Sequence, residues 1–338
     1  MPAGAPRFPR LQRLLAAALG ILAALAMAEG ALRWTGFGVR EPRVDDFHVT
    51  RDPAEAFWRI APGSNGSHRW DGDPYGTLPP GARMDYAFGA DGLRGEPPDP
   101  ARPAVLVLGD SFTFGEGVRA EDTFCARLER AFADRPGAPA FVNAGVPGYG
   151  TVEEAARLPE LLARYRPRAV LLVAIPNDAV PAREEIRVPD LINDRNPGAP
   201  AGLRLSALVR AVASRGARER DVEAWYLSYY FGERAARWEE ARRALDSIRA
   251  DCAARHLPLG VALFPLIHRM KERPFARIHA AYESACADRG LPFLDLMPFL
   301  QVEPERSLWV HPTDHHPNAR GHELAAAGLK PFVETLFR

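Results

Sequence analysis

A serine and a histidine-rich stretch, far apart in the sequence, carry side chains that could together perform nucleophilic catalysis. Ser111 follows the apolar run Ala104–Gly109, within the stretch GDSFTFGEG. Near the C-terminus, the stretch HPTDHHPN contains Asp314 and, two residues later, His316. A serine hydroxyl becomes a nucleophile when a histidine takes its proton and a carboxylate orients that histidine. The three residues therefore suit the roles of nucleophile, general base and orienting acid.

Two further polar stretches follow apolar runs and offer hydrogen-bond donors. NAGVPGYGT contains Gly145 and Gly148, and AIPNDA contains Asn177. A glycine lets backbone N–H groups approach a ligand closely, and an amide side chain is a neutral donor. Together with the N–H of Ser111 at a helix N-terminus, these groups could hold an oxyanion. Either glycine could supply the donor.

The C-terminal histidines leave two alternatives to consider. His311 and His315 could compete with His316 as the base, and such a cluster could also bind zinc. However, the stretch has no H-E-x-x-H helix, prolines break an i,i+4 register, and no cysteine lies nearby. We therefore predict neither a metal nor a cofactor.

Five short apolar runs predict the strands of one sheet. They lack polar alternation, which indicates strands covered on both faces, and helical spacing between them favours parallel pairing. We predict an α/β fold, a three-layer α/β/α sandwich with a five-stranded parallel sheet. The runs are Ala104–Gly109, Ala140–Gly145, Arg168–Ile175, Leu259–Phe264 and Leu291–Leu296. Ligands bind beyond the carboxyl ends of such strands, where the serine, glycines and asparagine lie.

The N-terminus resembles an export signal or signal anchor. Arg7, Arg10 and Arg13 precede the uncharged run Leu14–Ala28, which extends past Glu29. Basic residues before an apolar run keep the basic end inside the cell. Residues 1–33 are therefore expected to anchor the chain in the cell membrane, with the catalytic domain outside the cytoplasm. The AMA sequence that ends the run also fits a signal-peptidase site, in which case the protein is secreted.

The remaining chain divides by composition. Residues 34–100 are rich in Gly, Pro and Asp and predict a loop-rich spacer with short strands that packs on the catalytic domain, residues 101–338. Within the latter, 180–231 is too long for a connection and predicts a cap-like insertion. Its aromatic residues could stack on sugar rings or form the core of the cap. They are Trp225, Tyr226, Tyr229, Tyr230 and Phe231, followed by Trp238.

Charge and cysteine content exclude some classes of function. The chain has 43 basic and 43 acidic residues, so no overall basic surface favours nucleic acid. The three cysteines, Cys125, Cys252 and Cys286, are widely spaced and form no C-x-x-C pair. We expect them to be thiols of the core rather than a metal or redox site.

These motifs together resemble the SGNH hydrolases, also called the GDSL esterase/lipase family. GDSFTFGEG, NAGVPGYG, PND and DHHPN are similar to its four blocks, in chain order. The segment GADGLRGEP is similar to one that precedes the first block in membrane-anchored bacterial members. Many members place the aspartate three residues before the histidine, where this chain has Thr313, and carry glycine at the position of Pro176.

The resemblance implies a flavodoxin-like fold and ester hydrolysis or acyl transfer through an acyl-serine. It assigns Ser111 as nucleophile, His316 as base and Asp314 as its carboxylate, with an oxyanion hole of Ser111, Gly148 and Asn177. The expected substrate is a small-molecule or glycan acyl ester, with acetyl groups of an envelope or extracellular polysaccharide favoured. The alternative is an inactive SGNH-like scaffold that binds a glycan or a partner protein.

Overall fold

The structure is a computed structural model that describes residues 10–34, 49–51, 58–70, 72–99, 101–181, 218–312 and 314–337. The chain divides into two compact units. The first contains Met1–Arg43 and Val188–Val222, and the second contains Val44–Arg187 and Glu223–Arg338. The expected catalytic residues all belong to the second unit.

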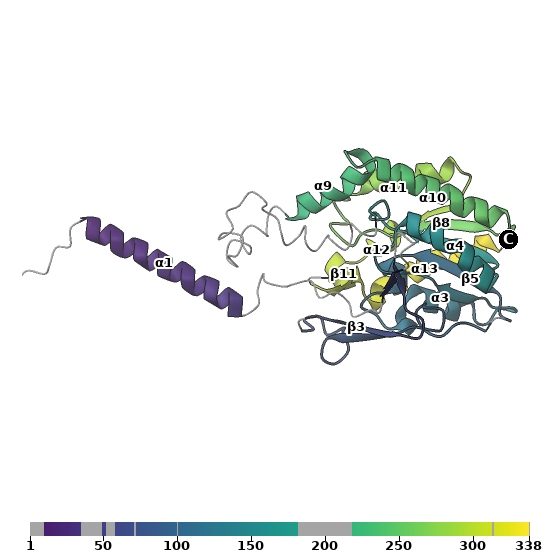
Figure 1. Ribbon diagram of the computed structural model, residues 1–338, viewed down its shortest axis with the longest axis horizontal. Coiled ribbons are helices and arrows are strands. Elements are labelled where there is room, and N and C mark those ends of the chain that lie inside the picture. Colours follow the sequence, from purple (N-terminus) through teal and green to yellow (C-terminus); the bar gives the residue numbers. More distant parts are fainter. Residues whose placement is uncertain are drawn as a thin grey trace, which may run out of the picture. The chain divides into compact units, whose positions relative to one another are not determined.

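In the first unit, helix α1 spans Arg10–Trp34 (Figure 1). Its segment Gln12–Ala31 is long and apolar enough to cross a membrane, by length and composition. Large apolar side chains along it, such as Leu14, Leu19 and Met27, are exposed. An exposed apolar helix near the N-terminus fits a signal sequence or a membrane anchor.

The second unit is built on a five-stranded sheet of order β6-β5-β7-β8-β9, in which every neighbouring pair is parallel. This is the 2-1-3-4-5 order of flavodoxin-like folds. The strands are β5 (Ala104–Gly109), β6 (Ala140–Asn143), β7 (Ala169–Ala174), β8 (Leu259–Leu263) and β9 (Phe293–Asp295). The five predicted strands are confirmed, with small differences at their ends.

Helices cover both faces of this sheet (Figure 1). Val105 and Val107 of β5 belong to one apolar core, with residues of α3, α12 and α13. Leu106 and Leu108 belong to the other, with residues of α4, α10 and α11. The bounds are α2 (Ser111–Phe114), α3 (Phe124–Phe132), α4 (Thr151–Tyr165), α9 (Arg218–Phe231), α10 (Ala236–Ala253), α11 (Ala276–Ala287), α12 (Met297–Leu300) and α13 (Ala319–Leu336). Because alternate residues of a strand face opposite cores, the predicted three-layer sandwich is confirmed.

Three small antiparallel sheets complete the described structure. Their strands are β1 (Val49–Arg51) with β2 (Trp58–Ile60), β3 (Asn65–Arg69) with β4 (Arg83–Ala87), and β10 (Trp309–His311) with β11 (Asp314–Pro317). Two 3₁₀ helices lie at η1 (Ala120–Asp122) and η2 (Glu305–Leu308). Of these, the β10–β11 hairpin carries the candidate base and its carboxylate.

The β3–β4 hairpin shares a core with the loops that leave the central sheet. Met84 and Tyr86 of β4 cluster with Phe114 and Val146, which follow β5 and β6, and with Val310 of β10. All five side chains are buried. The segment before residue 101 is thus packed against the loops that carry the candidate site.

Arg94, in the GADGLRGEP segment, holds the loop that follows α2. Its guanidinium donates to the carbonyls of Phe114, at 2.6 Å, Gly115 and Val118. It also lies 4.9 Å from the ring centroids of Tyr86 and of Phe114. Burial lowers the pKa of Arg94 to about 10, so the guanidinium stays charged at neutral pH. One buried cation therefore fixes three carbonyls of a short loop.

Arg94→Met keeps the aliphatic stem of the side chain but removes the charged donor. The carbonyls of Phe114 and Gly115 keep only long hydrogen bonds, from Asn143 Nδ2 at 3.4 Å and from the N–H of Val118 at 3.3 Å. We expect a loss of about 1–3 kcal/mol in unfolding free energy, the cost of leaving an acceptor such as the carbonyl of Val118 unsatisfied. Urea denaturation of the full chain in detergent, followed by circular dichroism, measures it. Arg102→Met is the matched control, because Arg102 is exposed. Equal midpoints for the two variants would contradict the clamp.

Most of the predicted insertion, 182–217, lies outside the described residues. In the part that is described, Tyr226, Tyr229 and Tyr230 are buried, as is Trp238 just after it. Trp238 lies 4.9 Å from Tyr230 and 4.8 Å from Tyr282 of α11, between ring centroids. Most of this aromatic group therefore packs as core, and does not form a sugar-stacking surface.

The cysteines follow the sequence prediction, and a side-chain cap fixes the start of the C-terminal helix. Cys125, Cys252 and Cys286 are buried free thiols. Asn318 caps α13, since its side chain accepts from the N–H groups of Arg320 and Gly321. The cap thereby holds the start of α13 directly after β11.

Candidate active site

The candidate residues meet where the strand order of the sheet reverses. Ser111 follows β5, Gly148 follows β6 on one side, and Asn177 follows β7 on the other. Chains leave such neighbouring strands in opposite directions, which opens a crevice beyond their carboxyl ends. His316 of β11 lies at the same edge of the sheet, in hydrogen-bond contact with Ser111.

Ser111, His316 and Asp314 form a continuous chain of hydrogen bonds. The Nε2 atom of His316 lies 2.9 Å from Ser111 Oγ, and its Nδ1 atom lies 2.5 Å from Asp314 Oδ1. Ser111 and the carboxyl end of Asp314 are largely buried, whereas the imidazole is partly exposed. This geometry suits proton transfer from the serine to the histidine.

Asp314 reaches the imidazole from two residues away because its side chain folds forward along β11. Its Oδ1 atom also accepts the backbone N–H of His316, at 3.1 Å. Its Oδ2 atom accepts from the indole Nε1–H of Trp70, at 2.8 Å. With a spacing of two residues, both oxygens of the Asp314 carboxylate therefore accept hydrogen bonds.

Opposite charges stabilise the Asp314–His316 pair. Burial alone would raise the pKa of Asp314, but the imidazolium of His316 and its hydrogen bonds lower that pKa below its usual range. Burial alone would lower the pKa of His316, but the carboxylates of Glu116 and Asp314 outweigh burial and raise it to about 10. The negative charges of Glu116 and Asp314 thus stabilise the imidazolium that forms when His316 accepts a proton.

Asp110 fixes the position of Ser111. It is the N-cap of α2, and its Oδ1 atom accepts from the N–H of Phe112 at 2.9 Å. Its Oδ2 atom lies 3.3 Å from Ser111 Oγ, and burial raises the pKa of Asp110 to about 6. A Cβ on Gly109 would lie 2.1 Å from Thr113 Oγ1, so only glycine allows this exit from β5. The whole GDS turn is therefore required for the position of the serine.

The two candidate glycine donors differ in their surroundings. The N–H of Gly145 already donates to Asn143 Oδ1, at 3.1 Å, and a Cβ there would lie 2.3 Å from Phe114 N. Gly148 is partly exposed, and its N–H has no hydrogen-bond partner within the described residues. Asn177 Nδ2 lies 3.5 Å from Asp110 Oδ2, beside the serine turn. Gly148 and Asn177 are thus better placed than Gly145 to donate to a ligand.

The other two histidines of the stretch do not face Ser111. His315 is exposed and stacks on Trp309, with ring centroids 3.7 Å apart. His311 is buried on β10 and pairs with Asp314 in the strand register. His316 is the histidine in hydrogen-bond contact with the serine.

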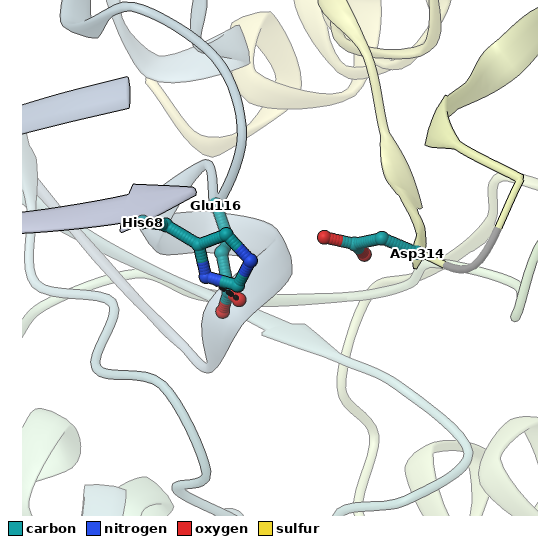
Figure 2. Close-up of side chains that lie close together, drawn as sticks. All are labelled: His68, Glu116 and Asp314. Atoms are coloured by element: carbon teal, nitrogen blue, oxygen red, sulfur yellow. Dashed lines mark ion pairs between the residues drawn. The ribbon is translucent and has the colours of Figure 1, made fainter. Parts of the chain in front are cut away.

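Three side chains that the sequence did not single out lie at the site: His68, Trp70 and Glu116. Figure 2 shows the carboxylate of Asp314 pointing toward His68 and Glu116. Possible ligand atoms of His68, Glu116 and Asp314 lie within 4.8 Å of one another, so these three residues could hold a cation. However, Asp314 already accepts hydrogen bonds at both oxygens. We therefore interpret the group as a support for the hydrogen-bonded chain.

Trp70→Phe removes the indole donor to Asp314 but keeps most of the buried ring. We expect kcat/KM for an ester to fall about 10- to 100-fold, since a hydrogen bond to a charged group contributes about 1.5–3 kcal/mol. Steady-state kinetics with p-nitrophenyl acetate measures the change. The control is Trp238→Phe, which removes a buried indole from α10. Equal kinetics for both variants would show that Trp70 does not support the carboxylate.

This chain is similar to several solved structures. A search of curated proteins finds no match. Among solved structures, TesA is similar at 18% identity and a TM-score of 0.45, over 69% of this chain and 99% of its own. A protein described as a putative lipolytic protein of the G-D-S-L family, from Desulfitobacterium hafniense, has 16% identity and a TM-score of 0.43, over 68% and 100%. The esterase EstA from Pseudoalteromonas has 14% identity and a TM-score of 0.42, over 68% and 98%.

A family match spans the residues that form the candidate site. Residues 107–324, more than half of the chain, match the GDSL-like Lipase/Acylhydrolase family. The matched range begins within β5 and ends within α13, so it includes Ser111, Gly148, Asn177, Asp314 and His316. The chain belongs to the GDSL-like Lipase/Acylhydrolase family, which indicates an enzyme that hydrolyses esters.

Proposed function

We propose that the protein is an exported serine esterase or O-acyltransferase that works through an acyl-serine intermediate. The observation that carries this proposal is the hydrogen-bonded chain Ser111–His316–Asp314 at the carboxyl edge of the sheet. Family membership supports the ester-hydrolysing chemistry. The complete set of nucleophile, base and orienting acid argues against an inactive scaffold.

In the first half-reaction, Ser111 Oγ attacks the carbonyl carbon of the ester while His316 Nε2 takes the hydroxyl proton. The carboxylate of Asp314 stabilises the imidazolium that forms. The tetrahedral oxyanion receives hydrogen bonds from the N–H groups of Ser111 and Gly148 and the amide of Asn177. Collapse of this intermediate breaks the ester C–O bond, and His316 gives its proton to the leaving alcohol.

In the second half-reaction, an acceptor hydroxyl attacks the acyl-serine. His316 takes the proton of the acceptor, and the ester bond to Ser111 Oγ breaks as that oxygen regains a proton. Water as acceptor gives hydrolysis, whereas a sugar hydroxyl gives acyl transfer. Because both outcomes use the same residues, the acceptor that reaches the crevice decides between them.

The first unit supports the proposed location outside the cytoplasm, and that location favours one class of substrate. The apolar span Gln12–Ala31, with basic residues before it, supports a membrane anchor or a cleaved signal, and a catalytic unit outside the cytoplasm. Acyl esters of an envelope or extracellular glycan are the substrates that such a location favours. The buried aromatic residues of α9 and α10 lend no support to sugar stacking.

A fluorophosphonate probe tests the serine mechanism. The full chain in detergent is expected to become covalently labelled at Ser111, identified by peptide mass spectrometry. Ser111→Ala should abolish the labelling. A folded wild-type protein that hydrolyses esters but labels elsewhere, or not at all, would contradict the assignment.

Acetate release with and without an added oligosaccharide separates the two activities. With an acetyl donor, a hydrolase releases the same acetate in both cases. A transferase releases less acetate when the sugar is present, and mass spectrometry finds the acetylated sugar.

A further inference from the structure

Glu116 places a second carboxylate on the imidazole edge that faces the serine. Its Oε2 atom lies 3.7 Å from His316 Nε2, the same nitrogen that lies 2.9 Å from Ser111 Oγ. Asp314 contacts the opposite nitrogen, Nδ1, at 2.5 Å. The imidazole ring therefore lies between two buried carboxylates, one at each nitrogen.

The loop that carries Glu116 is held firmly in place. The N–H of Glu116 donates to the carbonyl of Ser111 at 3.0 Å. The N–H of Gly117 donates to the hydroxyl of Tyr86 at 2.9 Å, and Arg94 binds the carbonyls on either side. A loop fixed at these points keeps the carboxylate close to the serine turn.

Strand β3 contacts both carboxylates. His68 Nδ1 lies 3.6 Å from Glu116 Oε1, and Trp70, just after the strand, donates to Asp314 Oδ2. The rings of His68 and Trp70 pack together, with centroids 4.0 Å apart. Figure 2 shows His68 and Glu116 together, with Asp314 directed at them. The same short segment thus aligns the two carboxylates that flank the base.

We propose that Glu116 is a positioning residue that holds the imidazolium form of His316 from its Nε2 side and so sets the pH range of catalysis. This inference rests on the proposed serine mechanism. When His316 has taken the serine proton, its Nε2–H lies between Ser111 Oγ and the Glu116 carboxylate. The negative charge of Glu116 then stabilises the charged intermediate and delays loss of the proton as the pH rises.

Several charged or titratable groups face the base. They are Asp314 and His315 on its own strand, Asp110 at the end of β5, Glu116 after α2 and His322 on α13, with His68 of β3 facing Asp314. The charge of Glu116 raises the pKa of His316, as do the charge and the hydrogen bond of Asp314 and the charge of Asp110. Burial keeps His322 neutral, because it lowers that pKa to about 3.

The test is the pH profile of kcat/KM for Glu116→Gln. A carboxylate raises the pKa of a neighbouring cation, so its removal lowers the pKa of His316 and frees the base at lower pH. The acidic limb should therefore move down by about 1–3 pH units, the range typical of an opposite charge at this distance. Glu116→Asp, which keeps the charge, should move the limb less than Glu116→Gln.

Glu121→Gln is the matched control, because it makes the same change five residues later at an exposed position. Its limb should stay at the wild-type pH. An acidic limb in Glu116→Gln that stays in place or moves up would overturn the proposal. Activity of the wild type that is lost in EDTA and restored by a divalent cation would also overturn it, because the carboxylate would then serve a cation.

The rate of fluorophosphonate labelling against pH is a second measurement that needs no ester substrate. The acidic limb of this rate profile should lie at the highest pH for the wild type, at a lower pH for Glu116→Asp and at the lowest pH for Glu116→Gln. If Ser111→Ala keeps its activity, the proposed function itself fails. If Ser111→Ala is inactive while Glu116→Gln keeps the wild-type limb, only the role of Glu116 fails.

Discussion

Ser111→Ala is expected to lower kcat for p-nitrophenyl acetate by about 10⁴-fold or more while the protein stays folded. Without Oγ no acyl-enzyme forms, and only the oxyanion donors and substrate binding remain, which leave a small residual rate. The change removes one atom from a short helix whose cap, Asp110, keeps its bond to the Phe112 N–H. Product formation followed over several hours measures the residual kcat, and a thermal denaturation curve shows whether the protein stays folded.

Ser307→Ala is the matched control, since Ser307 is an exposed serine whose hydroxyl donates to the nearby carbonyl of Pro304. It should retain wild-type kcat. A Ser111→Ala protein with more than a tenth of the wild-type kcat would show that another group is the nucleophile.

Asp314→Asn should lower kcat by about 10³–10⁴-fold with little change in KM. The carboxylate accepts from the backbone N–H and ring of His316 at one oxygen and from Trp70 at the other. An asparagine has one acceptor oxygen, so its NH₂ group must face a donor at one of these positions. The imidazole then loses either its orientation or its tautomer, which is what the base requires.

The chain offers a matched control in a second aspartate–histidine pair. Asp295 Oδ2 lies 2.9 Å from Nδ1 of the buried His279, and its Oδ1 atom accepts the N–H of Met297, two residues on. Asp295→Asn makes the same chemical change outside the crevice and should keep kcat within about threefold. If both variants lose activity equally, the effect of Asp314→Asn reflects stability instead of catalysis.

The sequence was sufficient for the sheet and for the residues that follow its strands. Uninterrupted apolar runs such as Ala104–Gly109 are recognisable because a strand buried on both faces has no polar position to alternate with. Once the strands are known, parallel topology brings Ser111 and Asn177 to one edge. The sequence does not say that the motif around His316 lies near that edge. In the structure, His316 is in hydrogen-bond contact with Ser111 there.

The supporting residues could not be predicted in this way. Trp70 and Asp314 are separated by 244 residues, and their contact depends on how the β3–β4 hairpin docks. No periodicity or spacing encodes such docking. Glu116 lies inside a recognised stretch, but its direction is set by the bonds of Tyr86 and Arg94 to the loop. The buried aromatic residues of α9 and α10 show the same limit. Their residue types alone allowed either a sugar-stacking surface or a core, and only the packing in the structure distinguishes the two.

The docking of the β3–β4 hairpin has a consequence for the order of synthesis. During translation Ser111 emerges 205 residues before His316, and Trp70 emerges 244 residues before Asp314. A nascent chain that ends before β11 has the serine turn but lacks both Asp314 and His316. Local contacts form before distant ones, and closure of these long loops comes late in folding. The hydrogen-bonded chain Ser111–His316–Asp314 can therefore form only after β11 has been added.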